Sequence, residues 1–310
     1  MKPQKQTRQP RRQVDGVLLL DKHGGLTSNA ALQTARRLLN AAKAGHTGTL
    51  DPMATGLLPL TFGEATKFSQ MLLDADKEYE ATVRLGLETD TGDAEGAVIA
   101  SSDIPPALTR EGILAALTRF TGEIEQIPPI YSALKRDGKP LYEYARAGIE
   151  VEIEPRRITI HSLQLLDWSG ESFRIRVACS KGTYIRSLAI DLGRALGCGA
   201  HLSGLRRTGI GPFKVEDAVS LTQLEAVAPE ARDGYLAPGD TLVRHLPPVE
   251  LDAEDSHALL QGRVIGVDRA VGGLVRVYGA SGRFLGLGEC MEGRLSAKRL
   301  IATNGAVRPD

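Results

Sequence analysis

The stretch of the chain that could carry out chemistry is residues 45–59. It contains three glycines, two prolines and three threonines around one carboxylate, that of Asp51. Because glycine tolerates positive φ and proline fixes φ near −65°, this composition predicts a loop with unusual backbone dihedrals. A single carboxylate held in such a loop could act as a nucleophile or as a general base.

A purely structural role for Asp51 is the alternative. Asp-Pro often begins a turn, in which the carboxylate accepts hydrogen bonds from nearby backbone amides. His46 lies five residues before Asp51, and the apolar residues Leu57, Leu58 and Leu60 follow it. These leucines would anchor the loop against a core, and catalytic groups tend to lie on loops that a rigid scaffold holds.

The composition is that of a globular protein. The chain has 310 residues, of which 42% are hydrophobic and 25% charged, so it can form a sizeable core and two domains. Its apolar runs, such as residues 17–20, are far shorter than the roughly 20 residues of a membrane span. The basic N-terminus is not followed by the apolar segment of a secretory signal. We therefore expect a cytoplasmic protein with no membrane partner.

The cysteines and histidines predict neither disulfides nor a metal site. Cys179, Cys198 and Cys290 are widely spaced, and we expect all three to be buried thiols. The six histidines form no His-x-x-x-His pair, and no Cys-x-x-Cys pair occurs. We expect no metal.

Charge is unevenly distributed along a chain whose formal net charge is zero. Residues 1–12 contain five basic residues and no acid, and residues 181–214 contain six basic residues against Asp191 alone. Residues 215–260 contain ten acids and two basic residues. A neutral protein of this kind can present a basic face to nucleic-acid phosphates.

Local patterns predict the elements that position the loop. Residues 1–13 are basic with little to bury, and we expect a disordered arm. The apolar run at 16–22 predicts a strand, and residues 29–40 predict an amphipathic helix capped by Thr27 or Ser28, followed directly by the loop. Further helices are predicted at 64–73, 109–120, 141–147 and after 181–186, and strands at 77–85 (with Tyr79 facing inward), 157–166 and 173–179.

These elements do not alternate strictly between helix and strand. The pattern therefore predicts an α+β fold around a mostly antiparallel sheet with flanking helices. An acidic, proline-containing segment leads to a boundary near residue 245, beyond which short β-like runs separated by glycine-rich turns predict a small barrel. We expect a basic arm over residues 1–13, a main domain over 14–244 and a small β domain over 245–310.

Six sequence blocks in this order closely resemble the TruB family, the bacterial tRNA pseudouridine-55 synthases. The blocks are GVLLLDK (16–22), GHTGTLDP (45–52), GEATK (63–67), KEY (77–79), YSALK (131–135) and CSKGTYIR (179–186). The resemblance extends from about residue 16 to residue 300. It implies a pseudouridine synthase fold with an RNA-binding, PUA-like barrel at the C-terminus. It also implies a tRNA-modifying isomerase that acts on the T-arm uridine at position 55.

The resemblance also implies roles for particular residues. Asp51 matches the catalytic aspartate of the family, and Tyr79 matches the tyrosine that stacks on the target base. Arg186 matches the arginine that pairs with the aspartate, and His46 the histidine that helps to hold the target loop.

Four further residues are expected to contact the RNA or the target nucleotide: Lys22, Tyr184, Leu205 and Lys67. One departure from the family pattern is His23, which stands where the family usually has proline, so the turn after Lys22 is less constrained.

Pseudouridine formation breaks and remakes one bond between ribose and uracil without redox change, so we expect no cofactor. Asp51 could attack ribose C1′, attack the uracil ring, or remove a ribose proton to give a glycal, and the sequence does not choose among these routes. Each route requires an ionised carboxylate. We expect the neighbouring Arg186 to lower the pKa of Asp51 and to keep it charged.

Two other function classes compete with this interpretation. A guide-dependent or non-catalytic RNA-binding protein could be built on the same fold, although the intact motifs favour a free-standing enzyme. A hydrolase acting on a glycosidic bond would normally need a second carboxylate as a proton donor. Only Asp51 stands out in the motif loop. We expect the protein to act as a monomer on tRNA.

Overall fold

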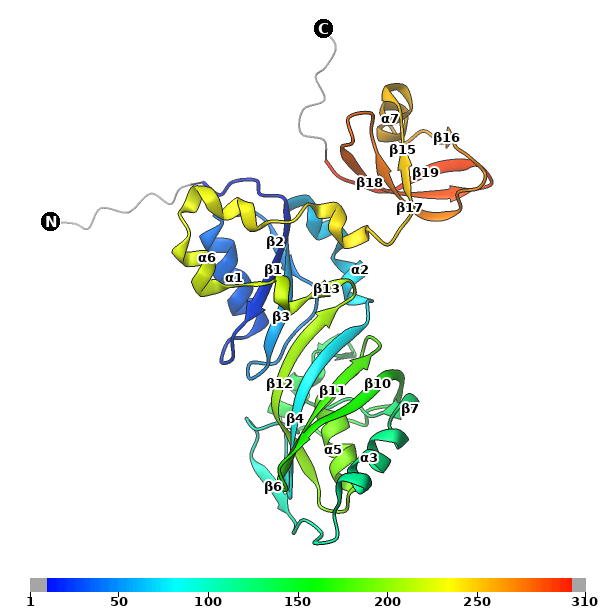
Figure 1. The fold of residues 1–310 in the computed structure, drawn as a ribbon. Coiled ribbons are helices and arrows are strands. Elements are labelled where there is room, and N and C mark those ends of the chain that lie inside the picture. Colours follow the sequence, from blue (N-terminus) through cyan, green and yellow to red (C-terminus); the bar gives the residue numbers. More distant parts are fainter. Residues whose placement is uncertain (1–9, 303–310) are drawn as a thin grey trace, which may run out of the picture.

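The computed structural model describes residues 10–302. The main part of the chain is an α+β domain built on a ten-stranded mixed sheet with the strand order β14-β1-β3-β12-β4-β11-β10-β7 (Figure 1). The other two of the ten strands lie off this path, since β13 pairs with β12 and β2 pairs with β3.

The strands of this sheet are β1 (Gly16–Lys22), β2 (Ala44–His46), β3 (Thr55–Phe62), β4 (Lys77–Leu85), β7 (Gly122–Gln126), β10 (Arg156–Trp168), β11 (Ser172–Cys179), β12 (Ala200–Ile210), β13 (Phe213–Lys214) and β14 (Val219–Ser220). Two small hairpins lie outside it, formed by β5 (Leu87–Thr89) with β6 (Val98–Ser101) and by β8 (Lys135–Arg136) with β9 (Lys139–Pro140).

The α-helices of the main domain are α1 (Ser28–Leu38), α2 (Ser69–Leu73), α3 (Arg110–Arg119), α4 (Leu141–Arg146), α5 (Ile185–Ala195) and α6 (Leu221–Ala226). Short 3₁₀ helices are η1 (Gly63–Phe68), η2 (Val215–Asp217), η3 (Pro229–Tyr235) and η4 (Gly239–Val243). Helices α1, α3, α5 and α6 contribute buried residues to one hydrophobic core with the sheet.

Most neighbouring strands of the sheet are antiparallel, as predicted. The parallel pairs are β14 with β1 and β3 with β12. The predicted strand at 16–22, the helix capped by Thr27 and the strand at 77–85 are confirmed. The helix at 109–120 is also confirmed, with Thr109 as its N-cap.

Three local predictions need correction. The loop predicted over 45–59 is shorter, because β2 extends to His46 and β3 begins at Thr55. The helix predicted at 64–73 is a 3₁₀ helix followed by one short α-helix. Strand β12 was not predicted, although it lies between β3 and β4 inside the sheet.

The C-terminal part of the described chain forms a second sheet with the order β15-β17-β18-β19-β16 and one helix, consistent with the expected small β domain. Its elements are β15 (Pro248–Glu250), α7 (Ala253–Leu260), β16 (Ile265–Gly266), β17 (Gly273–Tyr278), β18 (Phe284–Met291) and β19 (Arg294–Leu300). Phe284 packs against Phe68 with ring centroids 5.4 Å apart, so this sheet contacts the main domain near η1 (Figure 1).

The start of the described chain lies against α1. The backbone amide of Arg12 donates to Asn40 O, and its guanidinium forms an ion pair with Asp233. Residues 1–9 of the predicted disordered arm lie outside the described residues, whereas Arg11 and Arg12 are hydrogen-bonded to the packed structure, which corrects the prediction for these two residues. No helix within residues 10–302 combines the length and apolar character needed to cross a membrane.

Candidate active site

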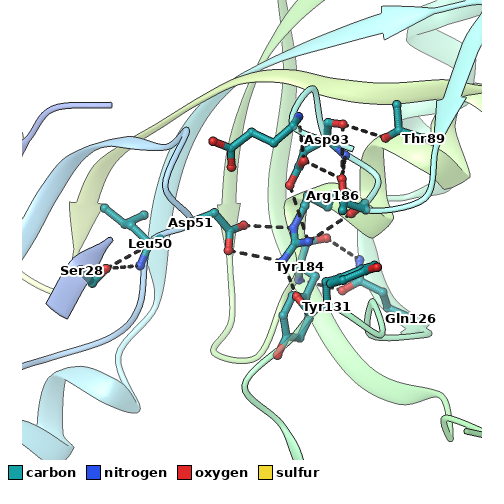
Figure 2. A network of polar contacts seen from close by, with 11 residues as sticks. Ser28, Leu50, Asp51, Thr89, Asp93, Gln126, Tyr131, Tyr184 and Arg186 are labelled. Carbon is teal, nitrogen blue, oxygen red and sulfur yellow. Dashed lines mark hydrogen bonds and ion pairs between the residues drawn. The ribbon is translucent and has the colours of Figure 1, made fainter. Parts of the chain in front are cut away.

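The predicted chemical loop connects β2 to β3 and is held on both sides of Asp51. Ser28, at the start of α1, binds both backbone groups of Leu50: its Oγ donates to Leu50 O at 3.0 Å and accepts from Leu50 N at 2.8 Å (Figure 2). Pro52 O accepts hydrogen bonds from Gly25 N at 2.9 Å and from the Lys22 ammonium at 3.2 Å. The backbone around Asp51 is therefore fixed rather than free.

Arg186 binds the Asp51 carboxylate with two donors. Its Nε lies 3.0 Å from Asp51 Oδ2, and its Nη2 donates to Asp51 Oδ1 at 3.3 Å (Figure 2). The remaining donors reach backbone carbonyls, since Nη2 also donates to Tyr131 O at 2.9 Å and Nη1 to Thr91 O at 3.1 Å. This fork geometry fixes the orientation of the carboxylate as well as pairing its charge.

A second carboxylate, that of Asp93, faces Arg186 from the other side. Asp93 Oδ2 lies 3.6 Å from Arg186 Nη1, and both side chains are buried. Asp93 Oδ1 accepts from Thr91 Oγ1 at 2.7 Å and from Glu95 N at 3.1 Å, which fixes it in its turn. Asp93 was not singled out from the sequence as a partner of the predicted arginine. The signal available was the dense run of turn residues Thr-Asp-Thr-Gly-Asp.

The pKa of Asp51 is raised above its ordinary value, which corrects the expectation of a lowered pKa, although Arg186 itself acts in the predicted direction. Burial is the largest cause, because it penalises the charged form. The Arg186 guanidinium acts in the opposite direction but does not outweigh burial, and the Asp93 carboxylate raises the pKa further. About one third of the Asp51 side chain is still exposed to the cavity, at 33%.

Asp51 lies in the wall of a cavity of about 520 Å³. The predicted residues Tyr79, Tyr184, Leu205 and Arg186 line the same cavity, so the structure brings them together around one carboxylate. Burial raises the pKa of the Tyr79 phenol, so its hydroxyl stays neutral at physiological pH. Of the described residues that line the cavity, Asp51 alone carries a carboxylate.

The backbone of Tyr184, which precedes α5, is bound by the buried side chain of Gln126. Gln126 Oε1 accepts from Tyr184 N at 2.8 Å, and Gln126 Nε2 donates to Tyr184 O at 3.0 Å (Figure 2). This pair fixes the start of α5, on which Arg186 is the second residue. Gln126 was not singled out from the sequence.

Three of the residues predicted to contact RNA do not line this cavity. Lys22 is buried, and its ammonium donates to His23 O, Leu26 O and Pro52 O, so it fastens the loop that carries Asp51. His46 lies in β2, and burial lowers its pKa, which keeps its ring neutral.

Lys67 lies away from the cavity, in η1. Its ammonium is 2.6 Å from a Glu64 carboxylate oxygen and donates to Leu300 O at 2.8 Å. Its geometry is therefore that of a link between the main domain and the C-terminal sheet, not of a group free to bind RNA beside Asp51.

Two more charged residues, Lys77 and Arg207, line the cavity and were missed. Arg207, on β12, is buried at 1% exposure, and its Nε donates to Leu57 O at 2.7 Å. Within the residues that the structure describes, no group of three or more His, Cys, Asp or Glu side chains is arranged to hold a metal ion.

Three family profiles match consecutive parts of the chain. "TruB family pseudouridylate synthase (N terminal domain)" matches residues 36–185, "tRNA pseudouridylate synthase B C-terminal domain" matches 186–251, and "Pseudouridine synthase II TruB, C-terminal" matches 247–301. The chain is 71% identical over 304 residues to the tRNA pseudouridine synthase B of Aromatoleum aromaticum, covering 98% of each chain. It is 65% identical to the protein of the same name from Azoarcus sp. strain BH72, covering 95% of this chain and 97% of that protein.

Two solved structures with a similar fold are a Cbf5–Nop10–Gar1 complex and an H/ACA RNP. A chain from a Cbf5–Nop10–Gar1 complex matches with a TM-score of 0.67 and 31% identity, over 89% of this chain and 78% of its own. A chain from an H/ACA RNP bound to a substrate RNA containing 2′-deoxyuridine matches with a TM-score of 0.69 and 27% identity, over 93% and 85%.

Proposed function

The chain belongs to the TruB family of pseudouridylate synthases and is a tRNA pseudouridine synthase, and we propose that it isomerises uridine 55 in the T arm of tRNA. The observation that carries the proposal is the cavity in which Asp51, held by the Arg186 fork, lies together with Tyr79. We propose that residues 14–244 form the catalytic domain and residues 245–310 an RNA-binding domain.

The reaction is an isomerisation in which atoms and electrons balance within one nucleotide. The bond from ribose C1′ to uracil N1 breaks, the base turns, and a bond from C1′ to C5 forms. C5 loses a proton and N1 gains one, so neither an oxidant nor a reductant is needed. A single carboxylate near the sugar and the base can serve this sequence, which agrees with the one carboxylate in the described cavity lining.

Asp51 is proposed as the group that reacts with the nucleotide. Attack on C1′, attack on the uracil ring and removal of a ribose proton all use its ionised form. Because the pKa of Asp51 is raised by burial, Arg186 is proposed to act against that penalty and to hold the carboxylate in one orientation. Arg186 is itself fixed by Asp93 and two backbone carbonyls, so the pair needs little rearrangement when the nucleotide binds.

Tyr79 is proposed to stack on the target base. A base of a folded tRNA must leave its stack to reach a carboxylate in a cavity, at a cost of a few kcal/mol. Stacking on an aromatic face contributes roughly 1–3 kcal/mol per base and thus offsets much of that cost. Tyr184 and Leu205 also line the cavity and are proposed to contact the base, and His46 is proposed to contact the target loop from outside the cavity.

A hydrolase and a guide-dependent protein are less well supported. A two-carboxylate glycosidase would need a second carboxyl group as proton donor in addition to Asp51, and none lies in the described cavity lining. The matching chains of the Cbf5–Nop10–Gar1 complex and of the H/ACA RNP are 31% and 27% identical to this chain, whereas the relatives named tRNA pseudouridine synthase B are 71% and 65% identical. We propose that the protein acts on tRNA as a monomer in the cytoplasm, without guide RNA or metal.

The test uses a tRNA transcript with tritium at uracil C5, in an assay that contains no guide RNA. We expect one equivalent of tritium to be released per tRNA, without free uracil among the products. A matched transcript that differs only by cytidine at position 55 should release none. No release from the first transcript would refute the activity, equal release from both would refute the position, and free uracil would indicate hydrolysis.

A further inference from the structure

Arg207 lies on the inner strand β12, beside the residues of the proposed active site. In the sheet it is opposite Tyr79 on β4 and opposite Gly56 on β3. Residues two apart in a strand share a face, and Leu205 and Arg207 both line the cavity that contains Asp51. The backbone of β12 therefore delivers a guanidinium to the cavity wall.

Part of the Arg207 guanidinium has no hydrogen-bond partner in the described chain, although its charge also acts on the neighbouring Tyr79 phenol. Its Nε donates to Leu57 O, but its Nη2 is buried without a hydrogen-bond partner. No Asp or Glu oxygen of residues 10–302 lies within 4.0 Å of its guanidinium. A buried cation without a counter-charge is unfavourable, and a bound anion would relieve that penalty.

The other buried cations around the cavity are already satisfied. The ammonium of Lys22 donates to three backbone carbonyls, and that of Lys77 donates to Leu72 O, Leu73 O and Ala75 O. Arg186 is paired with Asp51 and Asp93. Among these four basic residues, Arg207 is the one with donors left for a ligand.

The positive charge of Arg207 lowers the pKa values of neighbouring basic groups. Burial and the Arg207 guanidinium together lower the pKa of Lys77 to about 8. The same guanidinium adds to burial in lowering the pKa of His46. These effects indicate an excess of positive charge beneath the cavity, which favours an anion over a neutral group.

Gly48 packs against the buried Arg207 guanidinium at the cavity wall. Its φ is +125°, a conformation that residues with a Cβ rarely adopt. A Cβ built there would lie 3.6 Å from Arg207 Nη1, so any larger side chain would extend over the guanidinium. Gly48 and Arg207 both belong to the lining of the Asp51 cavity.

We propose that Arg207 binds a phosphate group that flanks the target uridine. This inference rests on the proposed function, because it takes the cavity to hold a nucleotide of tRNA. Every nucleotide brings a phosphate, and the planar fork of arginine matches two phosphate oxygens. The contact would fix the sugar–phosphate backbone while Tyr79 holds the base, and so would set the ribose in position beside Asp51.

The test measures binding of a T-arm stem-loop RNA that carries one uncharged methylphosphonate, placed either 5′ or 3′ of the target uridine. One of the two substitutions should weaken binding to the wild type by about tenfold or more, since it removes a charge-assisted hydrogen bond. The same methylphosphonate should not weaken RNA binding to the Arg207→Met variant any further, because this variant has already lost the contact between Arg207 and the phosphate. Additive effects of Arg207→Met and both methylphosphonates would overturn the proposal.

Arg206→Met is the matched control. Arg206 is the next residue on β12, points to the other face of the strand and pairs with Asp21 at 2.8 Å. The Arg206→Met variant also loses one positive charge, but not the proposed phosphate contact. Its effect on RNA binding should therefore add to the effect of each methylphosphonate. If Arg207→Met does not fold, the wild type decides alone: equal binding of both methylphosphonate RNAs and the unmodified RNA overturns the proposal. Binding is read separately from tritium release, so a wild type that binds RNA without turnover would refute only the proposed activity.

Discussion

Replacing Arg186 should change both the rate and its pH dependence. Arg186→Gln removes the cation that lowers the pKa of Asp51, so that pKa should rise further and the acid limb of the rate profile should move to higher pH. Arg186→Lys keeps a positive charge but cannot reproduce the two contacts with the Asp51 carboxylate. Its acid limb should therefore move less, although its rate should also fall.

The size of the effect follows from burial and from the number of contacts. Arg186 is 6% exposed and donates to Asp51, Tyr131 O and Thr91 O. Removing one member of a buried ion pair destabilises a protein by about 3–5 kcal/mol, and Arg186→Gln should lower the free energy of unfolding by this amount. Misplacing the carboxylate should lower the single-turnover rate by about 100-fold or more in both variants.

The assay is tritium release in single turnover between about pH 5 and pH 9, with urea unfolding of each variant. Arg194→Gln is the control, because Arg194 lies on the same helix and its exposed side chain pairs with Glu88 at 3.1 Å. It should cost less than about 1 kcal/mol of stability and leave the profile unchanged. An Arg186→Gln profile with an unmoved acid limb would refute the electrostatic argument, and near-normal turnover by Arg186→Lys would refute the need for the fork.

Three further predictions concern the same loop and strand. Because burial raises the pKa of Asp51 in the folded protein above its unfolded value, the wild type should gain stability relative to Asp51→Asn as pH falls through that raised pKa; a constant difference in urea unfolding would contradict this. Ser28→Ala should lose both hydrogen bonds to Leu50, costing about 1–3 kcal/mol in thermal unfolding and slowing tritium release; unchanged turnover would show that the loop needs no such support. Gly56→Ala should cost about 2–4 kcal/mol in urea unfolding, because φ is +98° and the new Cβ would overlap the Arg207 carbonyl; a neutral result would mean that β3 and β12 can separate locally.

Elements with a clear local pattern could be predicted from the sequence. The strand Lys77–Leu85 alternates apolar and polar residues, and the burial of its side chains alternates in the same way. Helix α1 carries its buried residues on one face and begins after Thr27, whose side chain caps it. These signals depend only on neighbours along the chain.

Strand β12 could not be predicted in this way. Its sequence, AHLSGLRRTGI, contains glycine, serine and two arginines and has no clean alternation. Its stability comes from pairing with β3 and β4, which lie more than 100 residues away in the sequence. Pro59 also led to a wrong prediction, that of a loop extending to residue 59. It lies within β3, opposite Leu19, although proline usually indicates a loop.

The identity of the charged residues in the site was easier to predict from the sequence than the direction in which their surroundings shift the pKa of Asp51. The motifs pointed to Asp51 and Arg186, and the two side chains are in contact. Burial of the carboxylate, which decides the direction of its pKa, is not visible in a sequence. Asp93 and Arg207 were missed because the residue type alone does not show whether a charged side chain is buried or exposed.

The most direct test of the account compares wild type with Asp51→Asn on the tritiated tRNA transcript. Both proteins should unfold cooperatively and bind the transcript with similar affinity, since Arg186 keeps Asp93 and two carbonyls as partners. The wild type should release one equivalent of tritium, and Asp51→Asn should release none. Tritium release by Asp51→Asn at the wild-type rate, with deamidation excluded by mass spectrometry, would contradict the central role assigned to this carboxylate.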